Sequence, residues 1–194
     1  MAIRTILPPT RGLISLNEAK AQLRVDFDDD DDLISAIILS ASALVEASVQ
    51  RRYIPQQIEW ITDVWKDKMV LPVAPGGDSQ SAVINSVVYT DTTSTQRILD
   101  PSLWWDRPAS DTRSLVRRWY AVYPLLGDGP ERIVINFSIK STSVVSPLAK
   151  HATKMLVSHF YKNPDAVVGV ENRDSSTEIP FGVEQLLSPE RWYQ

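Results

Sequence analysis

Residue types on which many catalytic and metal-binding proteins depend are scarce in this chain of 194 residues. Cysteine is absent, which excludes a disulfide framework, a thiolate metal site and a thiol nucleophile, and fits a reducing compartment. The two histidines, His151 and His159, are eight positions apart on one expected helix. Metal-binding pairs on helices favour a spacing of three or four, so we interpret both as core or boundary residues.

Phosphate-binding and nucleophile motifs are missing too. The seven glycines are scattered, and no Gly-Lys-Ser/Thr or Gly-x-Ser-x-Gly sequence occurs. The net charge of -4 argues against a protein whose main task is to grip nucleic acid through its phosphates. The opening MAIRTILPPTRG has no apolar run long enough for a signal peptide. We therefore predict no cofactor and no metal, and expect a water-soluble protein made in the cytoplasm.

The most informative stretch runs from Leu33 to Val49. Its apolar residues recur at the three-and-four spacing of a helix, and its only charge is Glu46. An ordinary surface helix has a charged outer face, whereas here Ala and Ser fill the remaining positions. Four serines, one glutamate and a length below the roughly 20 residues of a membrane span favour a helix packed by protein. We predict a central helix with a subunit contact formed by Ser35, Ile38, Ser42, Val45, Glu46 and Val49.

Five aspartates, Asp28 to Asp32, precede this stretch. We interpret them as a solvated helix start, where carboxylates also match the helix dipole. The alternative, a calcium loop, lacks the alternating oxygen ligands, the central glycine and the closing glutamate.

Two further helices have clear sequence signals. Ser15-Leu16-Asn17-Glu18 is a capping box and predicts a short helix from Leu16 to about Arg24. Ser146 and Pro147 suit the start of another helix, which ends at Asn163-Pro164.

Helical periodicity disappears between residues 55 and 141, where prolines and tryptophans accumulate. Short strand-like runs separated by turn residues take its place, so the sequence predicts an antiparallel β unit and an α+β fold. The expected strands are residues 58–64, 69–71, 82–90, 96–99, 114–122 and 132–139.

The last segment, Ile179 to Trp192, has prolines at intervals and large apolar side chains. We predict an extended conformation, which cannot bury these side chains against itself. The segment must therefore lie on another surface, either of its own domain or of a partner.

Two clusters could suggest other chemistry. Asp100, Asp106 and Asp111 surround Trp104-Trp105, as in a sugar site, but they fall in an apparent loop, and tryptophans in a small β unit are more often core. Arg113, Arg117 and Arg118 adjoin Trp119; a nucleic-acid contact is one interpretation, and a solvated strand face or subunit salt bridge is the other. We do not expect an enzyme.

Three blocks in order resemble phage head–tail connector (adaptor) proteins. They are LISLNEAKAQLRVDFDDDDDLISAIILSASALVEASVQRRYI, SPLAKHATKMLVSHFYKNPDAVVG and IPFGVEQLLSPERW. The first is similar to the family's opening, the second to its third helix and the third to its closing segment. The chain departs from the smallest members in its β region, which resembles an insertion found in longer ones, and it has Asn163-Pro164 where many members have Asn-Arg.

This resemblance implies a structural protein of the virion neck. Similar proteins form a ring, usually a dodecamer, beneath the capsid portal; the ring extends the DNA channel toward the tail, and DNA passes without specific binding. The resemblance also implies contacts with neck and tail proteins and none with membrane. A closing segment of this kind commonly reaches the portal, which assigns portal contacts to Ile179, Phe181, Val183, Leu186, Leu187 and Trp192.

The expected organisation is an N-terminal arm (residues 1–12), a helical connector domain (13–54 and 142–164), an inserted β domain (55–141) and an extended C-terminal arm (165–194). Two alternatives remain open. One is another neck or tail ring component, such as a head-closure or tail-completion protein. The other is a small carbohydrate-binding or hydrolase module on the tryptophan-rich β unit.

Overall fold

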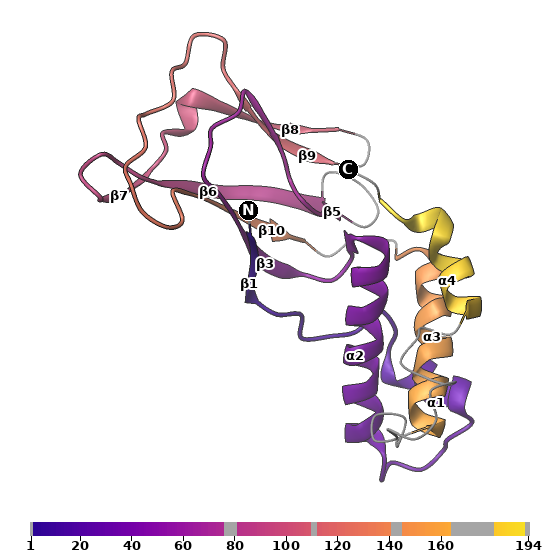
Figure 1. Cartoon of the computed structure of the whole chain (residues 1–194). Coiled ribbons are helices and arrows are strands. Elements are labelled where there is room, and N and C mark those ends of the chain that lie inside the picture. Colours follow the sequence, from indigo (N-terminus) through magenta and orange to yellow (C-terminus); the bar gives the residue numbers. More distant parts are fainter. Residues whose placement is uncertain (1, 76–80, 110–111, 141–144, 164–180, 193–194) are drawn as a thin grey trace, which may run out of the picture. The chain divides into compact units, whose positions relative to one another are not determined.

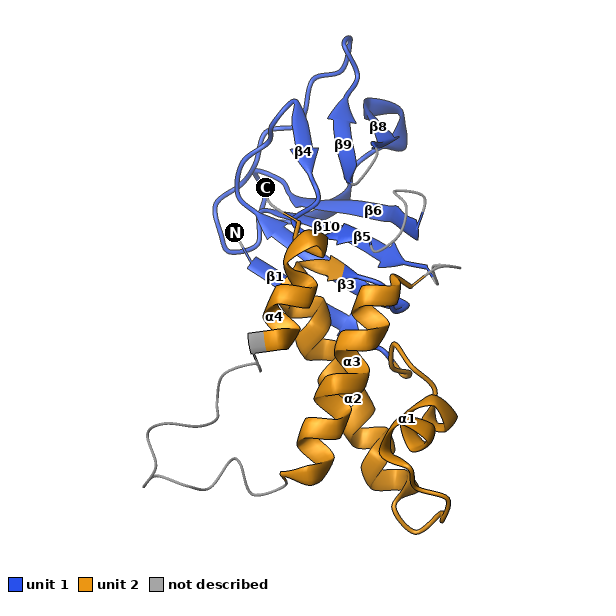
Figure 2. Ribbon diagram, turned by 90° about the vertical axis from the view of Figure 1, so that its right-hand side faces the viewer, with its two compact units in different colours: residues 1–9, 52–143, 194 blue, residues 10–51, 144–193 orange. Residues whose placement is uncertain are grey.

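The computed structural model describes residues 2–75, 81–109, 112–140, 145–163 and 181–192. The chain forms two compact units, coloured separately in Figure 2. The β unit comprises residues 1–9, 52–143 and 194, and the helical unit comprises residues 10–51 and 144–193. Each unit therefore combines segments that are distant in the sequence.

The helical unit is built on α2, the longest of the helices in Figure 1. The charge-poor stretch does form this helix, as predicted, and the predicted capping box at the start of α1 is present: Ser15 Oγ accepts from the amide of Glu18, and the Glu18 carboxylate accepts from the amide of Ser15. Ser146 accepts from the amide of Leu148 at the start of α3. The helices are α1 (Leu16–Leu23), α2 (Asp31–Val49), α3 (Pro147–Lys162) and α4 (Phe181–Leu187), followed by the 3-10 turn η3 (Ser188–Glu190).

The core of the helical unit combines branched residues with alanines. Ala41 on α2 and Ala149 and Ala152 on α3 are fully buried, and small side chains allow two helices to approach closely. Gly12, in the segment before α1, allows the chain to approach α2 closely, because a Cβ there would lie 2.2 Å from Ile38 Cγ2. The larger buried side chains are Leu13, Ile14, Ile34, Ile38, Val45, Val49, Leu156, Val157, Val183, Leu187 and Trp192.

The capping box gives a pH-dependent prediction. The hydrogen bond from the Ser15 amide lowers the pKa of the Glu18 carboxyl. A carboxyl whose pKa is lower in the folded than in the unfolded state stabilises the fold above its unfolded pKa, and this contribution is lost as the pH falls through the folded pKa. We expect Ser15→Ala to cost about 1 kcal/mol at neutral pH. Chemical denaturation of wild type, Ser15→Ala and Glu18→Gln across pH 3–7 tests both points; identical pH profiles for wild type and Glu18→Gln would contradict the second.

The β unit contains a five-stranded antiparallel sheet in the order β1-β3-β10-β6-β7. A second antiparallel sheet has the order β4-β9-β8. The strands are β1 (Ala2–Leu7), β2 (Arg51–Arg52), β3 (Gln56–Thr62), β4 (Lys68–Val70), β5 (Ala74–Pro75), β6 (Ala82–Thr90), β7 (Gln96–Ile98), β8 (Trp104–Pro108), β9 (Arg113–Arg117) and β10 (Ile133–Ile139), with the 3-10 turn η2 (Pro101–Leu103) before β8.

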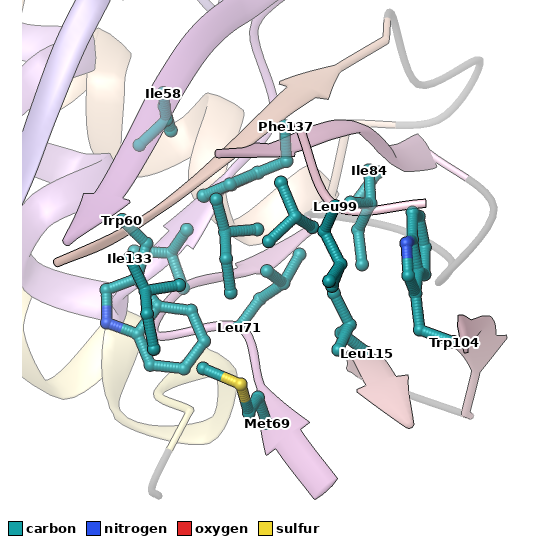
Figure 3. Close-up of a cluster of buried hydrophobic side chains, with 14 of the residues drawn as sticks. Ile58, Trp60, Met69, Leu71, Ile84, Leu99, Trp104, Leu115, Ile133 and Phe137 are labelled. Atoms are coloured by element: carbon teal, nitrogen blue, oxygen red, sulfur yellow. The ribbon is translucent and has the colours of Figure 1, made fainter. Parts of the chain in front are cut away.

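One face of the larger sheet packs against the smaller sheet (Figure 3). Alternate residues of β3 and β10 point into this core, which follows from the two-residue period of a strand. Phe137 and Leu115 come from opposite sheets, and both are fully buried. Core packing therefore uses the tryptophans Trp60 and Trp104, as expected for tryptophans in a small β unit.

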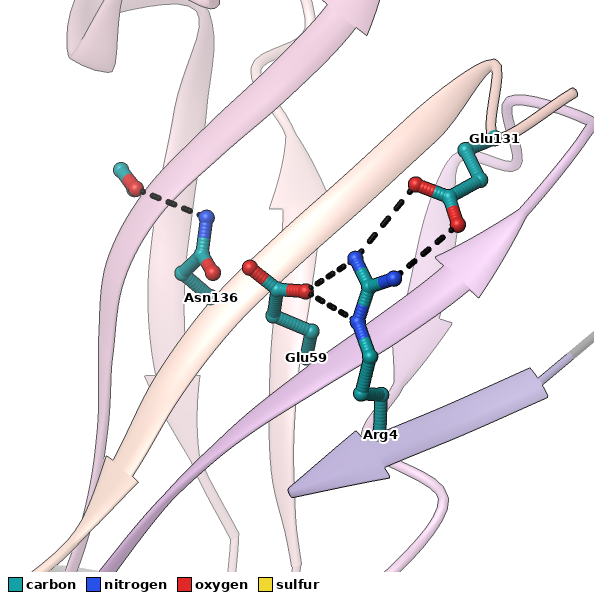
Figure 4. A network of polar contacts seen from close by, with 5 residues as sticks. Arg4, Glu59, Glu131 and Asn136 are labelled. Atoms are coloured by element: carbon teal, nitrogen blue, oxygen red, sulfur yellow. Dashed lines mark hydrogen bonds and ion pairs between the residues drawn. The ribbon is translucent and has the colours of Figure 1, made fainter. Parts of the chain in front are cut away.

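The opposite face of the larger sheet carries a polar network (Figure 4). Arg4 on β1 pairs with Glu59 on β3 at 2.6 Å and with Glu131 at 3.2 Å. Asn136 on β10 donates to Ser86 on β6. These contacts link β1 to β3 and β10 to β6 on the face that points away from the core.

Four expectations about local structure were wrong. The expected strand 114–122 ends at Arg117, and residues 118–122 do not form a strand. Residues 2–7 form the edge strand β1 instead of an irregular arm: Pro8-Pro9 excludes a helix but leaves the preceding β-branched residues free to pair with β3. Trp104–Pro108 is a strand instead of a loop, because β9 supplies its partner. Residues 181–190 are helical instead of extended, because they pack on the helical unit.

Candidate subunit and partner-binding surfaces

The exposed side of α2 has no charge from Leu33 to Ser48, since Glu46 is buried. We call this side the outer face of α2. Leu33 and Leu39 are 53% and 40% exposed, and small residues lie between them and beyond. The outer face consists of Leu33, Ser35, Ala36, Leu39, Ser40, Ala43 and Ala47.

The serines do not make this surface strongly polar. Ser40 Oγ donates to the Ala36 carbonyl at 3.0 Å, and Ser48 Oγ donates to the Leu44 carbonyl at 2.8 Å. A hydroxyl that donates to a carbonyl of its own helix already has a hydrogen-bond acceptor, so it needs little further hydrogen bonding from solvent or from a partner chain. By length and composition alone α2 also passes the test for a membrane span, as do many helices in the cores of water-soluble proteins. Its uncharged exposed surface suits contact with another helix.

Of the six residues predicted for the subunit contact, only Ser35 is exposed. The other five, Ile38, Ser42, Val45, Glu46 and Val49, are buried inside the chain itself. Ser42 Oγ donates to the Ile38 carbonyl and accepts from the amide of Leu13 at 2.9 Å. These residues thus support the helix from within, and the exposed residues of α2 are the ones available to a second subunit.

The aspartate run is partly used in holding helix ends together. Lys20 Nζ lies 2.7 Å from both Asp28 and Asp31, and these hydrogen bonds raise the pKa of Lys20. The Tyr161 hydroxyl donates to Asp30, which raises the pKa of Tyr161. The run therefore links α1, α2 and α3, and among the described residues no group of three or more potential metal ligands comes together.

The C-terminal segment lies against the C-terminal end of α2. The amide of Trp192 donates to the Val49 carbonyl at 2.9 Å, and Arg51 Nε donates to the Glu190 carbonyl at 2.9 Å. The last carbonyls of a helix have no partner within that helix, so the segment completes the end of α2. Ser146, which caps α3, donates to the Glu190 carboxylate at 2.7 Å.

The residues predicted to contact the portal differ in their burial. Val183, Leu187 and Trp192 are buried within the helical unit, so the segment lies on its own domain, one of the two possibilities that the sequence left open. Leu186 is half-buried. Ile179 and the side chain of Phe181 lie outside the described residues.

Two of the three carboxylates of the candidate sugar site form structural hydrogen bonds or ion pairs. Asp106 forms a two-pronged ion pair with the buried Arg113, and Asp100 accepts from the amide of Ser102. Asp111 lies outside the described residues. Arg117 pairs with Asp67 at 2.7 Å, and Arg118 lies 5.1 Å from the Trp105 ring centroid. These arginines therefore stabilise strands and an aromatic side chain, which matches the structural interpretation of the cluster.

Sequence reasoning missed one surface, the connection from β9 to β10. Trp119, Val122 and Leu125 are 83%, 81% and 81% exposed there. Their apolar character was visible in the sequence. However, Trp119 and Val122 fell within the expected strand 114–122, whereas β9 ends at Arg117 and the residues that follow it have neither helical nor strand geometry.

An uncharged helix surface on a small bundle, together with an antiparallel β unit, is typical of a structural protein that works through contacts with other chains. Residues 13–97 match the family described as "Phage gp6-like head-tail connector protein". The resemblance to head–tail connectors seen in the sequence is therefore confirmed over these residues. No curated protein matches the chain.

Solved structures share the fold over the whole length. The neck of an empty gene transfer agent (GTA) particle, computed with C6 symmetry, contains a chain of TM-score 0.74 and 18% identity; the match covers 100% of this chain and 97% of that one. A chain in the neck of the native GTA particle, computed with C12 symmetry, has a TM-score of 0.72 and 18% identity, with the same coverage. A chain in the virion of the native GTA has a TM-score of 0.72 and 19% identity, again with the same coverage.

Proposed function

We propose that this protein is a head–tail connector in the neck of a tailed phage or phage-like particle. Copies of the chain form a ring beneath the portal, extend the DNA channel and present a docking surface for the tail. The observation that carries the proposal is the agreement between the family match of residues 13–97 and a fold shared over the whole chain with neck proteins. C12 symmetry in one of these necks supports a dodecamer.

The outer face of α2 is the proposed contact between neighbouring subunits. Leu39 supplies apolar area, Ala36 and Ala43 allow a second helix to approach, and no exposed charge has to be desolvated. Of the six residues that the sequence predicts for the subunit contact, Ser35 is the one that lies on the outer face of α2. A standard interface buries roughly 800 Å² per partner, an area that one helix face and its surroundings can supply.

The segment from residue 179 to 192 is the proposed portal-facing part. Its buried residues Val183, Leu187 and Trp192 fix the segment on the helical unit, while Leu186 and the exposed Glu184 and Gln185 are available to the portal. Thus the anchor residues and the contact residues of the segment have separate tasks.

Mass measurement of the purified protein, alone and mixed with its portal protein, tests the proposal. We expect either a ring of the free chain or a complex in which about twelve copies join the portal. A chain that stays monomeric and ignores the portal would exclude a connector. A ring that binds a tail protein and ignores the portal would instead favour a head-closure or tail-completion protein.

A further inference from the structure

We propose that residues 118–126, here called the display loop, dock on the β unit of a neighbouring copy of the same chain. The receiving surface is centred on the exposed Ile98, at the edge of a row of apolar side chains on the side of the five-stranded sheet that points away from the core, here called the outer row: Ile61, Val134, Val88 and Ile98. This inference rests on the proposed ring and adds a second contact to it, separate from the outer face of α2.

The backbone of the display loop is held in place by the β unit. Ala121 is buried, and its carbonyl accepts a hydrogen bond from Arg117. Tyr123 stacks on Trp65 with ring centroids 4.4 Å apart, and Trp65 Nε1 donates to the Pro124 carbonyl at 3.0 Å. Burial raises the pKa of Tyr123 to about 12, so this anchor stays neutral at physiological pH. An anchored loop loses little conformational entropy when it binds.

Between these anchors the loop presents large side chains to solvent. The exposed side chains are those of Trp119, Tyr120, Val122 and Leu125. The Trp119 ring packs edge-on against the Tyr120 ring, with the ring centroids 5.4 Å apart. Four side chains of this size offer on the order of 500 Å² of contact area. That is more than half of the roughly 800 Å² per partner in a standard interface. Exposed aromatic residues on a fixed backbone are typical of interaction hot spots.

The exposure of the outer row increases toward the sheet edge: Val134 is buried, Ile61 and Val88 are half-buried, and Ile98 is open to solvent. Val134 faces Ile61 on one side and Val88 on the other, and Val88 faces Ile98 on the edge strand β7. None of the four belongs to the core cluster between the sheets, and Ile98 is 71% exposed. The next row along, by contrast, holds the polar residues Arg4, Glu59, Asn136 and Ser86.

A second copy is the occupant that fits both surfaces. The display loop and the outer row are different patches of one unit, so pairing them gives a head-to-tail contact, the kind that closes into a ring. Charges agree as well: the loop holds Arg118 and no acidic residue, whereas the exposed Asp63 follows the row on β3. The similar neck structures have C6 and C12 symmetry, which requires such contacts.

Because the chain has no cysteine, a thiol can be introduced at one chosen position at a time. We expect full-length Val122→Cys and Ile98→Cys proteins, mixed and oxidised at ring-forming concentration, to form a heterodimeric disulfide. Each variant alone should stay unlinked. The matched control pairs Val122→Cys with Thr93→Cys, an exposed position on the β6–β7 hairpin outside both patches. Non-reducing electrophoresis and mass spectrometry identify the products.

The disulfide experiment distinguishes failure of the display-loop contact from failure of the proposed ring. A ring without the Val122–Ile98 disulfide, or with the control pair linked equally well, overturns the display-loop contact and leaves the connector proposal standing. Disulfides between two Val122→Cys chains would also overturn it, because they indicate a symmetric contact. A chain that remains monomeric, with no disulfide, contradicts both proposals.

Gly127, which directly follows the display loop, gives a prediction about the anchoring of that loop. A Cβ at this position would lie 2.0 Å from the Asp91 carbonyl oxygen, a backbone atom that cannot swing away. We expect Gly127→Ala to lower the urea midpoint of the β unit below that of wild type. The control is Gly182→Ala, where the nearest atom is Met155 Cε at 3.6 Å. Urea denaturation of both variants tests this; equal midpoints would show that the loop relaxes freely.

Discussion

Ala43→Arg is expected to abolish ring formation while leaving the chain folded. Ala43 lies on the outer face of α2, exposed and flanked by Leu39 and Ala47. An arginine there would place a long charged side chain in a contact that has no exposed charge of its own. Removing an unpaired charge from water costs several kcal/mol per copy, and the ring repeats this cost at every interface.

Size-exclusion chromatography with light scattering measures this effect, and circular dichroism confirms the fold. Gln22→Arg is the matched control, because Gln22 is exposed on α1 away from the outer face and an arginine near a helix C-terminus is tolerated. We expect the control to behave as wild type. If Ala43→Arg still assembled normally, the outer face of α2 would not be the subunit contact.

Trp192→Ala is expected to destabilise the helical unit by about 3 kcal/mol or more, the usual cost of truncating a buried tryptophan. Trp192 is 8% exposed, and its amide caps the Val49 carbonyl. Its loss would leave a cavity at the end of α2 and loosen the segment that holds Val183 and Leu187. The portal-facing segment would then lose its fixed position, so portal binding should weaken as well.

The chain supplies a matched control for this experiment. Trp119→Ala makes the same chemical change at a site that is 83% exposed, where the expected cost is within about 0.5 kcal/mol. Urea denaturation followed at 222 nm reports the helices in both variants. Similar losses of stability in the two would contradict the assignment of Trp192 as an anchor. The Trp119 variant should instead weaken the contact proposed for the display loop.

Several elements were predictable because their signals are local. The capping box specifies the start of α1, Ser146-Pro147 specifies the start of α3, and the expected strand 82–90 coincides with β6. In each case the deciding interactions lie within a few residues of one another. The missed strand β1 depends instead on a partner far along the chain, Glu59 for Arg4, and β8 depends on the next strand, β9, in which Leu115 faces Asp106.

The candidate surfaces show the same division. The sequence showed that Glu46 is the one ionisable side chain from Leu33 to Val49. It could not show which residues face outward, because burial of Ile38 and Val45 is decided by the α3 that packs against α2.

By itself, the sequence determined the helix signals, the change to strand periodicity after residue 55 and the resemblance to head–tail connectors that residues 13–97 carry. Only the tertiary structure decided that residues 181–190 are helical and that Trp192 is an anchor of its own unit. The physical reason is the range of the forces involved. Caps and periodicity act between neighbours in the chain, whereas burial is a property of surfaces that meet only after folding.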